Sequence, residues 1–121
     1  ADARIEFVNW AGLASHPHHE RAAKYLPLGP GSVFSFGVKG GRPVGQRFIE
    51  SVDLASHLAN IGDAKTLVIH PASTTHAQLS EQQLADASVG PGLVRISVGI
   101  EDVDDIIADL DQALAAAVKG E

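Results

Sequence analysis

The sequence predicts a two-layer α/β sandwich, in which a mixed or antiparallel sheet of about four strands carries helices on one face. Segments with strand periodicity alternate with segments of helical periodicity along the chain. Each amphipathic helix needs a sheet face against which to bury its apolar stripe. Several strands place polar residues at alternate positions, which disfavours a doubly wound parallel sheet. The length of 121 residues, 45% of them hydrophobic, favours a single domain over 1–121.

The first half of the chain contains two predicted strands and two predicted helices. Residues 4–9 alternate polar and apolar and predict a strand. Pro17 suits the first turn of a helix, which we expect to end near Tyr25. Residues 32–38 are rich in aromatic and β-branched side chains and predict the second strand. Apolar residues then recur at helical spacing, which predicts an amphipathic helix over 43–58.

The second half repeats this alternation. Residues 66–70 predict a short strand that Pro71 ends, and residues 93–98 predict a fourth strand. Between them, Ser80 and Gln83 have the spacing of a capping box, which predicts a helix of about two turns. The last predicted helix places a row of apolar residues on one face: Val103, Ile106, Ile107, Leu110 and Leu114.

Composition excludes several classes of protein. With 9 basic and 15 acidic residues the net charge is −6, which disfavours a nucleic-acid partner, because phosphates are held mainly by clustered Lys and Arg. The absence of cysteine removes disulfides and thiol nucleophiles, and no apolar run approaches the roughly 20 residues that span a bilayer. We therefore expect a soluble, cytoplasmic protein without a membrane partner. The start at Ala1 and the absence of methionine favour a piece of a longer chain.

The sequence gives little support to a metal site, a phosphate-binding loop or a hydrolase triad. His16, His18 and His19 surround Pro17, but adjacent helical side chains point about 100° apart, so we expect no metal site there. The glycine-rich run 36–41 lacks the spacing of a phosphate-binding loop. Serine, histidine and aspartate are present, yet no nucleophile elbow accompanies them.

Two features are stronger candidates for a binding site. The loop 70–76, His-Pro-Ala-Ser-Thr-Thr-His, offers many hydrogen-bond groups directly after a strand; it is either a binding loop or a turn whose hydroxyls bond their own backbone. Arg95 projects from mid-strand, on the face opposite to Val94 and Ile96. Its guanidinium suits an acidic ligand, and the alternative is an ion pair with one of the acidic residues.

These segments resemble the C-terminal part of the Cys/Met-metabolism family of pyridoxal-phosphate enzymes, which have the fold-type I architecture. The resemblance rests on the loop 70–76 and the Arg-Ile-Ser-Val-Gly-Ile-Glu-Asp segment 95–102. The segments 24–27, 36–41 and 60–67 are similar to the O-acetylhomoserine sulfhydrylase branch. The resemblance covers essentially the whole chain.

The resemblance implies substrate-binding residues but no catalytic ones. It assigns Arg95 to the α-carboxylate of the substrate, places Asn60 beside that carboxylate, and places Thr75 near the hydrogen-bond network of the cofactor lysine. The family's cofactor lysine lies in a Ser/Thr-x-Thr-Lys context, which surrounds none of the four lysines here. We therefore expect pyridoxal 5'-phosphate to be bound by the whole enzyme and not by this chain, which we expect to be inactive alone.

The implied reaction is γ-replacement, in which O-acetylhomoserine and sulfide give homocysteine and acetate during methionine biosynthesis. The resemblance also implies a homotetrameric whole enzyme. Two alternatives stay open: a sister enzyme of the cystathionine γ-synthase or γ-lyase type, and a free-standing, non-catalytic binding domain. The net charge of −6 and the single-domain length favour the second alternative.

Overall fold

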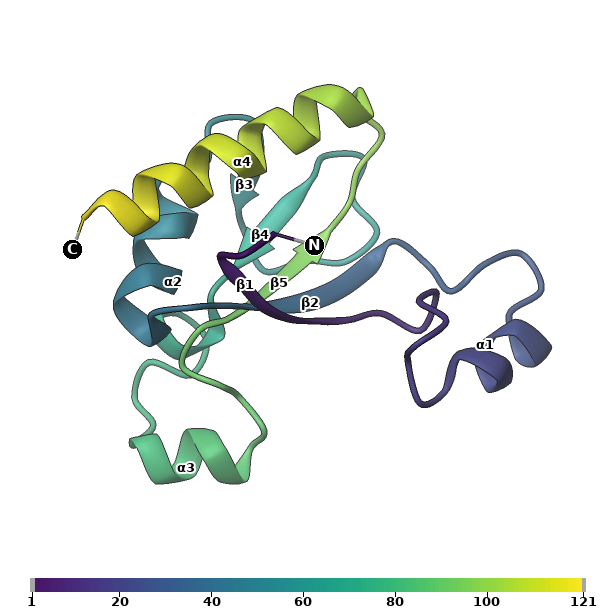
Figure 1. The fold of residues 1–121 in the computed structure, drawn as a ribbon, viewed down its shortest axis with the longest axis horizontal. Helices are drawn as coiled ribbons and strands as arrows, with labels where there is room; N and C mark the ends of the chain where they lie inside the picture. The colour runs from purple at the N-terminus through teal and green to yellow at the C-terminus, as the bar shows by residue number, and fades with distance from the viewer. Residues whose placement is uncertain (1, 121) are drawn as a thin grey trace.

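A computed structural model describes residues 2–120 of the chain, which form one sheet and a layer of helices (Figure 1). The strands are β1 (Ile5–Asn9), β2 (Val33–Val38), β3 (Ser56–His57), β4 (Leu67–Ile69) and β5 (Leu93–Ser97). The helices are α1 (His19–Tyr25), α2 (Gly41–Glu50), the 3-10 turn η1 (Pro71–Ser73), α3 (Glu81–Asp86) and α4 (Val103–Lys119).

The sheet is mixed, with the strand order β1-β2-β5-β4-β3. All neighbouring strands pair antiparallel except β3 and β4, which pair parallel. The predicted α/β class and mixed sheet are confirmed, while the strand count is five and not about four. The additional strand, β3, contains only two residues, which is too short to leave a periodic signal in the sequence.

The main core lies between the sheet and the helices α2 and α4. From the sheet it takes Phe36, Val68, Val94 and Ile96, and from the helices Val44, Phe48, Ala113, Leu114 and Ala117. Phe36 and Phe48 meet edge to face, with ring centroids 5.7 Å apart, a favourable aromatic geometry. Burial of these apolar side chains holds the helical layer on one face of the sheet.

Two helices lie outside this layer. None of the residues of α1 is buried, and Figure 1 shows this helix standing off beyond β1 and β2. The helix α3 begins at the predicted capping box, since the Ser80 hydroxyl accepts from the Gln83 amide and the Gln83 side chain accepts from the Ser80 amide. Its Leu84 packs in a small second cluster with Ala72 and Val89.

The predicted helix over 43–58 is wrong at its C-terminal end, because α2 ends at Glu50. The cause is Asp109 on α4, a buried carboxylate that accepts the amide of Asp53 at 2.7 Å and that of Ala55 at 2.9 Å. These amides therefore cannot continue the helical hydrogen bonds, and the chain turns into β3 instead.

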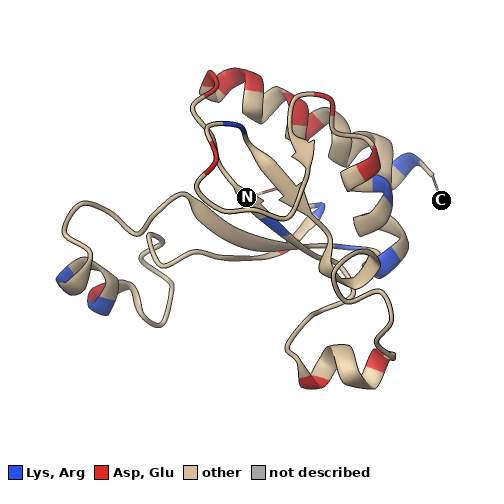
Figure 2. Cartoon of the chain, turned by 180° about the vertical axis from the view of Figure 1, so that it is seen from behind, with Lys and Arg blue, Asp and Glu red and all other residues tan. Residues whose placement is uncertain are grey.

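The predicted apolar face of α4 is also partly wrong. Ile106 and Leu114 are buried as expected, but Val103 is 63% exposed and Ile107 is 59% exposed. The buried face runs instead through small residues and Asp109, which lets α4 lie against α2. The first half of α4 and the segment before it carry a concentration of acidic residues (Figure 2).

Candidate functional site

The face of the sheet opposite to α2 and α4 carries the predicted arginine. The strand register places Ser35 of β2, Arg95 of β5 and Ile69 of β4 in one row across the sheet. Val94 and Ile96, on either side of Arg95, are fully buried in the main core. Strand alternation therefore turns Arg95 away from the core, as the sequence predicts.

A hollow of about 740 Å³ lies over this part of the face, and we call it the Arg95 hollow. Arg95, Asn60 and Thr75 all line it, so the structure brings together the three residues that the resemblance assigns to the substrate. Much of the remaining wall is apolar, with Ile69 and Leu93 among its residues. A few polar groups on an apolar wall are typical of sites for small molecules.

Among the residues that the structure describes, the Arg95 side chain makes a single hydrogen bond, from Nη2 to the backbone oxygen of Asn60 at 3.2 Å. Within residues 2–120, no carboxylate lies within 4 Å of its guanidinium, so the alternative of an internal ion pair is absent there. A guanidinium offers five N–H donors in a planar fork. Those that Asn60 does not use can receive a carboxylate in the bidentate geometry.

Asn60 and Thr75 are exposed and use their side chains locally. The Asn60 side-chain oxygen accepts the backbone amide of Ile61 at 2.9 Å, so the backbone oxygen of Asn60, and not its side-chain oxygen, meets Arg95. The Thr75 hydroxyl lies 2.8 Å from Nδ1 of His76. His76, which also lines the Arg95 hollow, is missing from the predicted site residues although it belongs to the same loop motif.

The first histidine of this loop is a structural residue. The fully buried His70 places Nε2 2.7 Å from the carbonyl of Pro91, which can only accept, so Nε2 carries the proton. Nδ1 then accepts the hydroxyl of Ser73 at 2.8 Å. Burial lowers the pKa of His70 and keeps the ring neutral, although the bond to Pro91 opposes this shift.

The structure thus divides the loop 70–76 between the two alternatives that the sequence leaves open. The Thr74 hydroxyl donates to the backbone oxygen of His70 at 2.9 Å, as expected for a self-bonded turn, and Ser73 Oγ lies 3.3 Å from the same oxygen. Thr75 and His76 lie on the Arg95 hollow. The first part of the motif therefore fixes the loop, and the last part reaches the candidate site.

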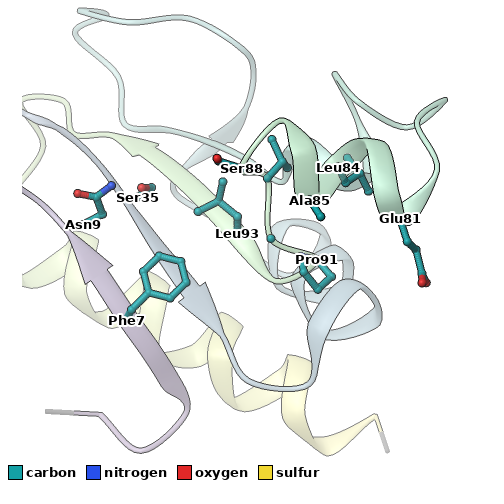
Figure 3. A pocket seen from close by; sticks show the side chains of 11 residues that line it. Phe7, Asn9, Ser35, Glu81, Leu84, Ala85, Ser88, Pro91 and Leu93 are labelled. Carbon is teal, nitrogen blue, oxygen red and sulfur yellow. The ribbon is translucent and has the colours of Figure 1, made fainter.

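A second hollow of about 710 Å³ adjoins the first and shares Asn9, Ser35 and Leu93 with it. Figure 3 shows the strand residues Phe7 and Leu93 facing α3 and the turn after it across this second hollow. The open face of the sheet is therefore a broad surface, and Arg95 lies on its middle strand, β5.

None of the four lysines of the chain lines either hollow, and all four are exposed. A lysine that holds a carbonyl cofactor covalently needs a desolvated setting or a cationic neighbour to lower its pKa. The residues present here therefore do not fit the covalent binding of pyridoxal phosphate.

The histidines near the N-terminus bond within the chain. His16 Nε2 lies 2.8 Å from the side-chain oxygen of Asn9, and His19 Nδ1 lies 2.9 Å from the backbone oxygen of Ala11. Across residues 2–120, no three His, Asp or Glu side chains gather in a geometry that could hold a metal ion. The same residues include no helix with the length and apolarity needed to cross a membrane.

Comparison with known families places this geometry in context. The family model of the Cys/Met metabolism PLP-dependent enzymes matches residues 1–115. The chain belongs to this family. The match runs from β1 into the second half of α4 and includes every residue of the Arg95 hollow.

Individual members of the family are similar to this chain in sequence and in structure. O-acetyl-L-homoserine sulfhydrylase 1 from Thermus thermophilus is 54% identical over 112 residues, which are 93% of this chain and 27% of that protein. A solved structure from Campylobacter jejuni, assigned as an O-acetylhomoserine (thiol)-lyase and carrying a pyridoxyl-lysine monophosphate, has a TM-score of 0.85 at 40% identity, over 95% of this chain and 27% of that chain.

A sister enzyme has the same fold. The cystathionine gamma synthase from Xanthomonas oryzae pv. oryzae, solved with cystathionine, has a TM-score of 0.85 at 32% identity, over all of this chain and 31% of that chain. The chain thus spans about a quarter to a third of the length of these relatives. The fold-type I family assignment that the sequence motifs imply is confirmed.

Proposed function

We propose that this chain is the substrate-carboxylate-binding part of a pyridoxal-phosphate enzyme that converts O-acetylhomoserine and sulfide to homocysteine and acetate. The observation that carries the proposal is the half-buried guanidinium of Arg95, which lines an apolar-walled hollow and has no carboxylate partner within residues 2–120. The similarity to O-acetyl-L-homoserine sulfhydrylase 1 at 54% identity supports the choice of substrate.

In this proposal the chain binds and orients the substrate. The α-carboxylate of O-acetylhomoserine receives two N–H groups of Arg95, and the Asn60 carbonyl holds the guanidinium in the orientation that presents them. Thr75 and His76 border the rest of the substrate. Fixing one end of a substrate in this way lowers the entropic cost of bringing its reacting end to a catalytic group.

The bond-making chemistry lies with groups outside this chain. Pyridoxal phosphate supplies an electron sink when it is bound, but the residues present here provide no lysine at the hollow to hold it. The tetrameric state that the resemblance implies and the cytoplasmic setting expected from the composition stay predictions.

The second candidate is a cystathionine γ-synthase, which the cystathionine-bound relative of equal TM-score favours. The test is the sulfur donor. The full-length enzyme that carries this segment is supplied with O-acetylhomoserine and either sulfide or cysteine, and homocysteine and cystathionine are quantified. The proposal expects faster turnover with sulfide, whereas faster turnover with cysteine would assign the chain to the sister enzyme.

A further inference from the structure

Glu101, which follows β5, holds Thr66, which precedes β4. The amide of Thr66 donates to one carboxylate oxygen of Glu101 at 2.7 Å, and its hydroxyl donates to the other oxygen at 2.7 Å. Thr66 is fully buried. The amide of Thr66 is the main cause that lowers the pKa of Glu101, so the carboxylate is charged at neutral pH.

The same hydroxyl also receives a hydrogen bond from the other side. The Gly99 amide donates to Thr66 Oγ1 at 2.9 Å, and the Ile100 amide donates to the Ala64 carbonyl at 2.9 Å. A side chain at Gly99 would meet the Ala64 carbonyl oxygen at 2.3 Å, so only glycine permits this approach. We call the set of Glu101, Thr66 and Gly99 the carboxylate latch.

The carboxylate latch fixes one end of the loop 58–65, whose side chains are not buried. Residues 58–65 are all exposed and contain no regular secondary structure. Besides the latch, the loop is tied to β5 through the Gly62 amide, which donates to Ser97 Oγ at 3.3 Å, and through the contact of Asn60 with Arg95. The position of the Asn60 carbonyl therefore depends on hydrogen bonds from the far end of β5.

The carboxylate latch and the arginine site share the same two segments. Arg95 lies in β5, upstream of Gly99 and Glu101, and Asn60 lies in the loop that Thr66 ends. Releasing Thr66 would free the loop to move away from β5, and the guanidinium would lose the acceptor that orients it. A displacement of about 1 Å in a positioning group can reduce turnover or binding markedly.

We propose that Glu101 is a positioning residue for the substrate-binding Arg95, acting through Thr66 and the loop 58–65. The inference rests on the proposed function, because it gives Arg95 the α-carboxylate as its ligand. A carboxylate suits this position because both of its oxygens accept, whereas a glutamine offers a single oxygen, so one of the two Thr66 donors loses its acceptor.

The experiment uses Glu101→Gln in the full-length enzyme, with Asp105→Asn as the matched control, since Asp105 is an exposed carboxylate of α4. The expected result is a rise in KM for O-acetylhomoserine of about tenfold with kcat within about twofold, because binding and not chemistry is disturbed. Asp105→Asn should change neither value. A KM for Glu101→Gln equal to that of Asp105→Asn overturns the proposal.

A double-mutant cycle separates this inference from the proposed function. If Glu101 acts through Arg95, adding Glu101→Gln to Arg95→Ala should raise KM no further than about twofold. If the KM increases of the two single variants multiply in full in the double variant, the positioning role is overturned and the proposed function stays intact. An Arg95→Ala enzyme with unchanged KM contradicts the proposed function itself, and the positioning role with it.

A conservative pair at Thr66 keeps the proposal testable if Glu101→Gln does not fold. Thr66→Ser retains the hydroxyl that bridges Glu101 and Gly99, whereas Thr66→Val removes it at nearly constant volume. The expected KM of Thr66→Ser is close to that of the parent enzyme, and that of Thr66→Val rises about tenfold. Equal KM values for the two variants overturn the proposal.

Discussion

The guanidinium of Arg95 is held by the backbone carbonyl of Asn60, a residue 35 positions earlier in the chain, across a hydrogen bond of 3.2 Å. The bond joins strand β5 to the loop between β3 and β4. A backbone oxygen orients the guanidinium without neutralising its charge, which an internal carboxylate would do. The arrangement leaves the arginine able to attract an anionic ligand.

Gly45 of α2 lies against the ring of His70, and this contact predicts the effect of Gly45→Ala. A β-carbon at this position would approach His70 Nε2 to 2.4 Å. Alanine favours the helix by up to ~1 kcal/mol over glycine, but we expect the overpacking to prevail and to lower the free energy of unfolding by about 1–3 kcal/mol. Urea unfolding of the 121-residue chain measures the change.

Gly90→Ala is the matched control, because no atom lies within 4 Å of the β-carbon it adds. It should leave the stability within about 0.5 kcal/mol, as expected for an uncrowded surface position. If Gly45→Ala is as stable as Gly90→Ala, His70 does not occupy the position described here.

The buried carboxylate of Asp109 predicts a second stability effect. Asp109→Ala leaves the buried amide of Ala55 and the amide of Asp53 without their acceptor. We expect a loss of about 2–4 kcal/mol in the free energy of unfolding at pH 7, whereas the exposed Asp105→Ala should cost less than about 0.5 kcal/mol. An equal effect of both substitutions in urea unfolding would contradict the role of Asp109 in ending α2.

Asp109 also predicts an acid-dependent loss of stability. Burial raises the pKa of Asp109, but the amides of Ala55 and Asp53 and the side chain of Gln112 together lower it below its ordinary 3.8. The unfolded chain thus binds a proton more readily, so the stabilisation is complete above that value and is lost as the pH falls through and below it. The stability difference between the parent chain and Asp109→Asn should stay constant from pH 6 to about pH 4 and should narrow as the pH falls further.

His70 predicts a loss of stability at a higher pH. Burial lowers its pKa below the ordinary 6.5, so the unfolded chain takes up a proton that the folded ring resists. The contribution of the neutral ring is complete above 6.5 and is lost as the pH falls from there towards the pKa of the folded state. Melting temperatures measured from pH 8 to pH 5 should fall for the parent chain.

Two variants isolate that contribution. His70→Gln should be less stable at pH 8 and should show a shallower decline towards pH 5, because the titrating ring is gone. His18→Gln, which replaces an exposed histidine directly before α1, should follow the parent curve. A decline of the same slope in His70→Gln would show that the buried ring is not the titrating group.

Features set by neighbouring residues follow from the sequence. The capping box at Ser80 spans three positions, so its two hydrogen bonds are decided locally and the structure contains both. The outward orientation of Arg95 follows from the twofold alternation of strand β5, and the apolar neighbours Val94 and Ile96 make that alternation readable.

Features set by distant residues do not follow from it. The end of α2 depends on Asp109, which lies more than 50 positions away. From the sequence alone, Asp109 cannot be told apart from the exposed acidic residues of the same helix. The contact between Arg95 and Asn60 uses a backbone atom, which leaves no compositional signal. The buried face of α4 was predicted from hydrophobicity, whereas close packing against α2 selects small residues such as Ala113.

The central claim is that Arg95 binds the substrate carboxylate, and the most direct measurement is the KM for O-acetylhomoserine of the full-length Arg95→Ala enzyme. The control is Arg21→Ala, which removes an arginine from the distant helix α1. We expect KM to rise by about two orders of magnitude, since truncating one partner of a desolvated charge pair costs about 2–5 kcal/mol. The absorbance of the bound cofactor should stay unchanged in both variants. An Arg95→Ala enzyme whose KM equals that of Arg21→Ala would contradict the claim.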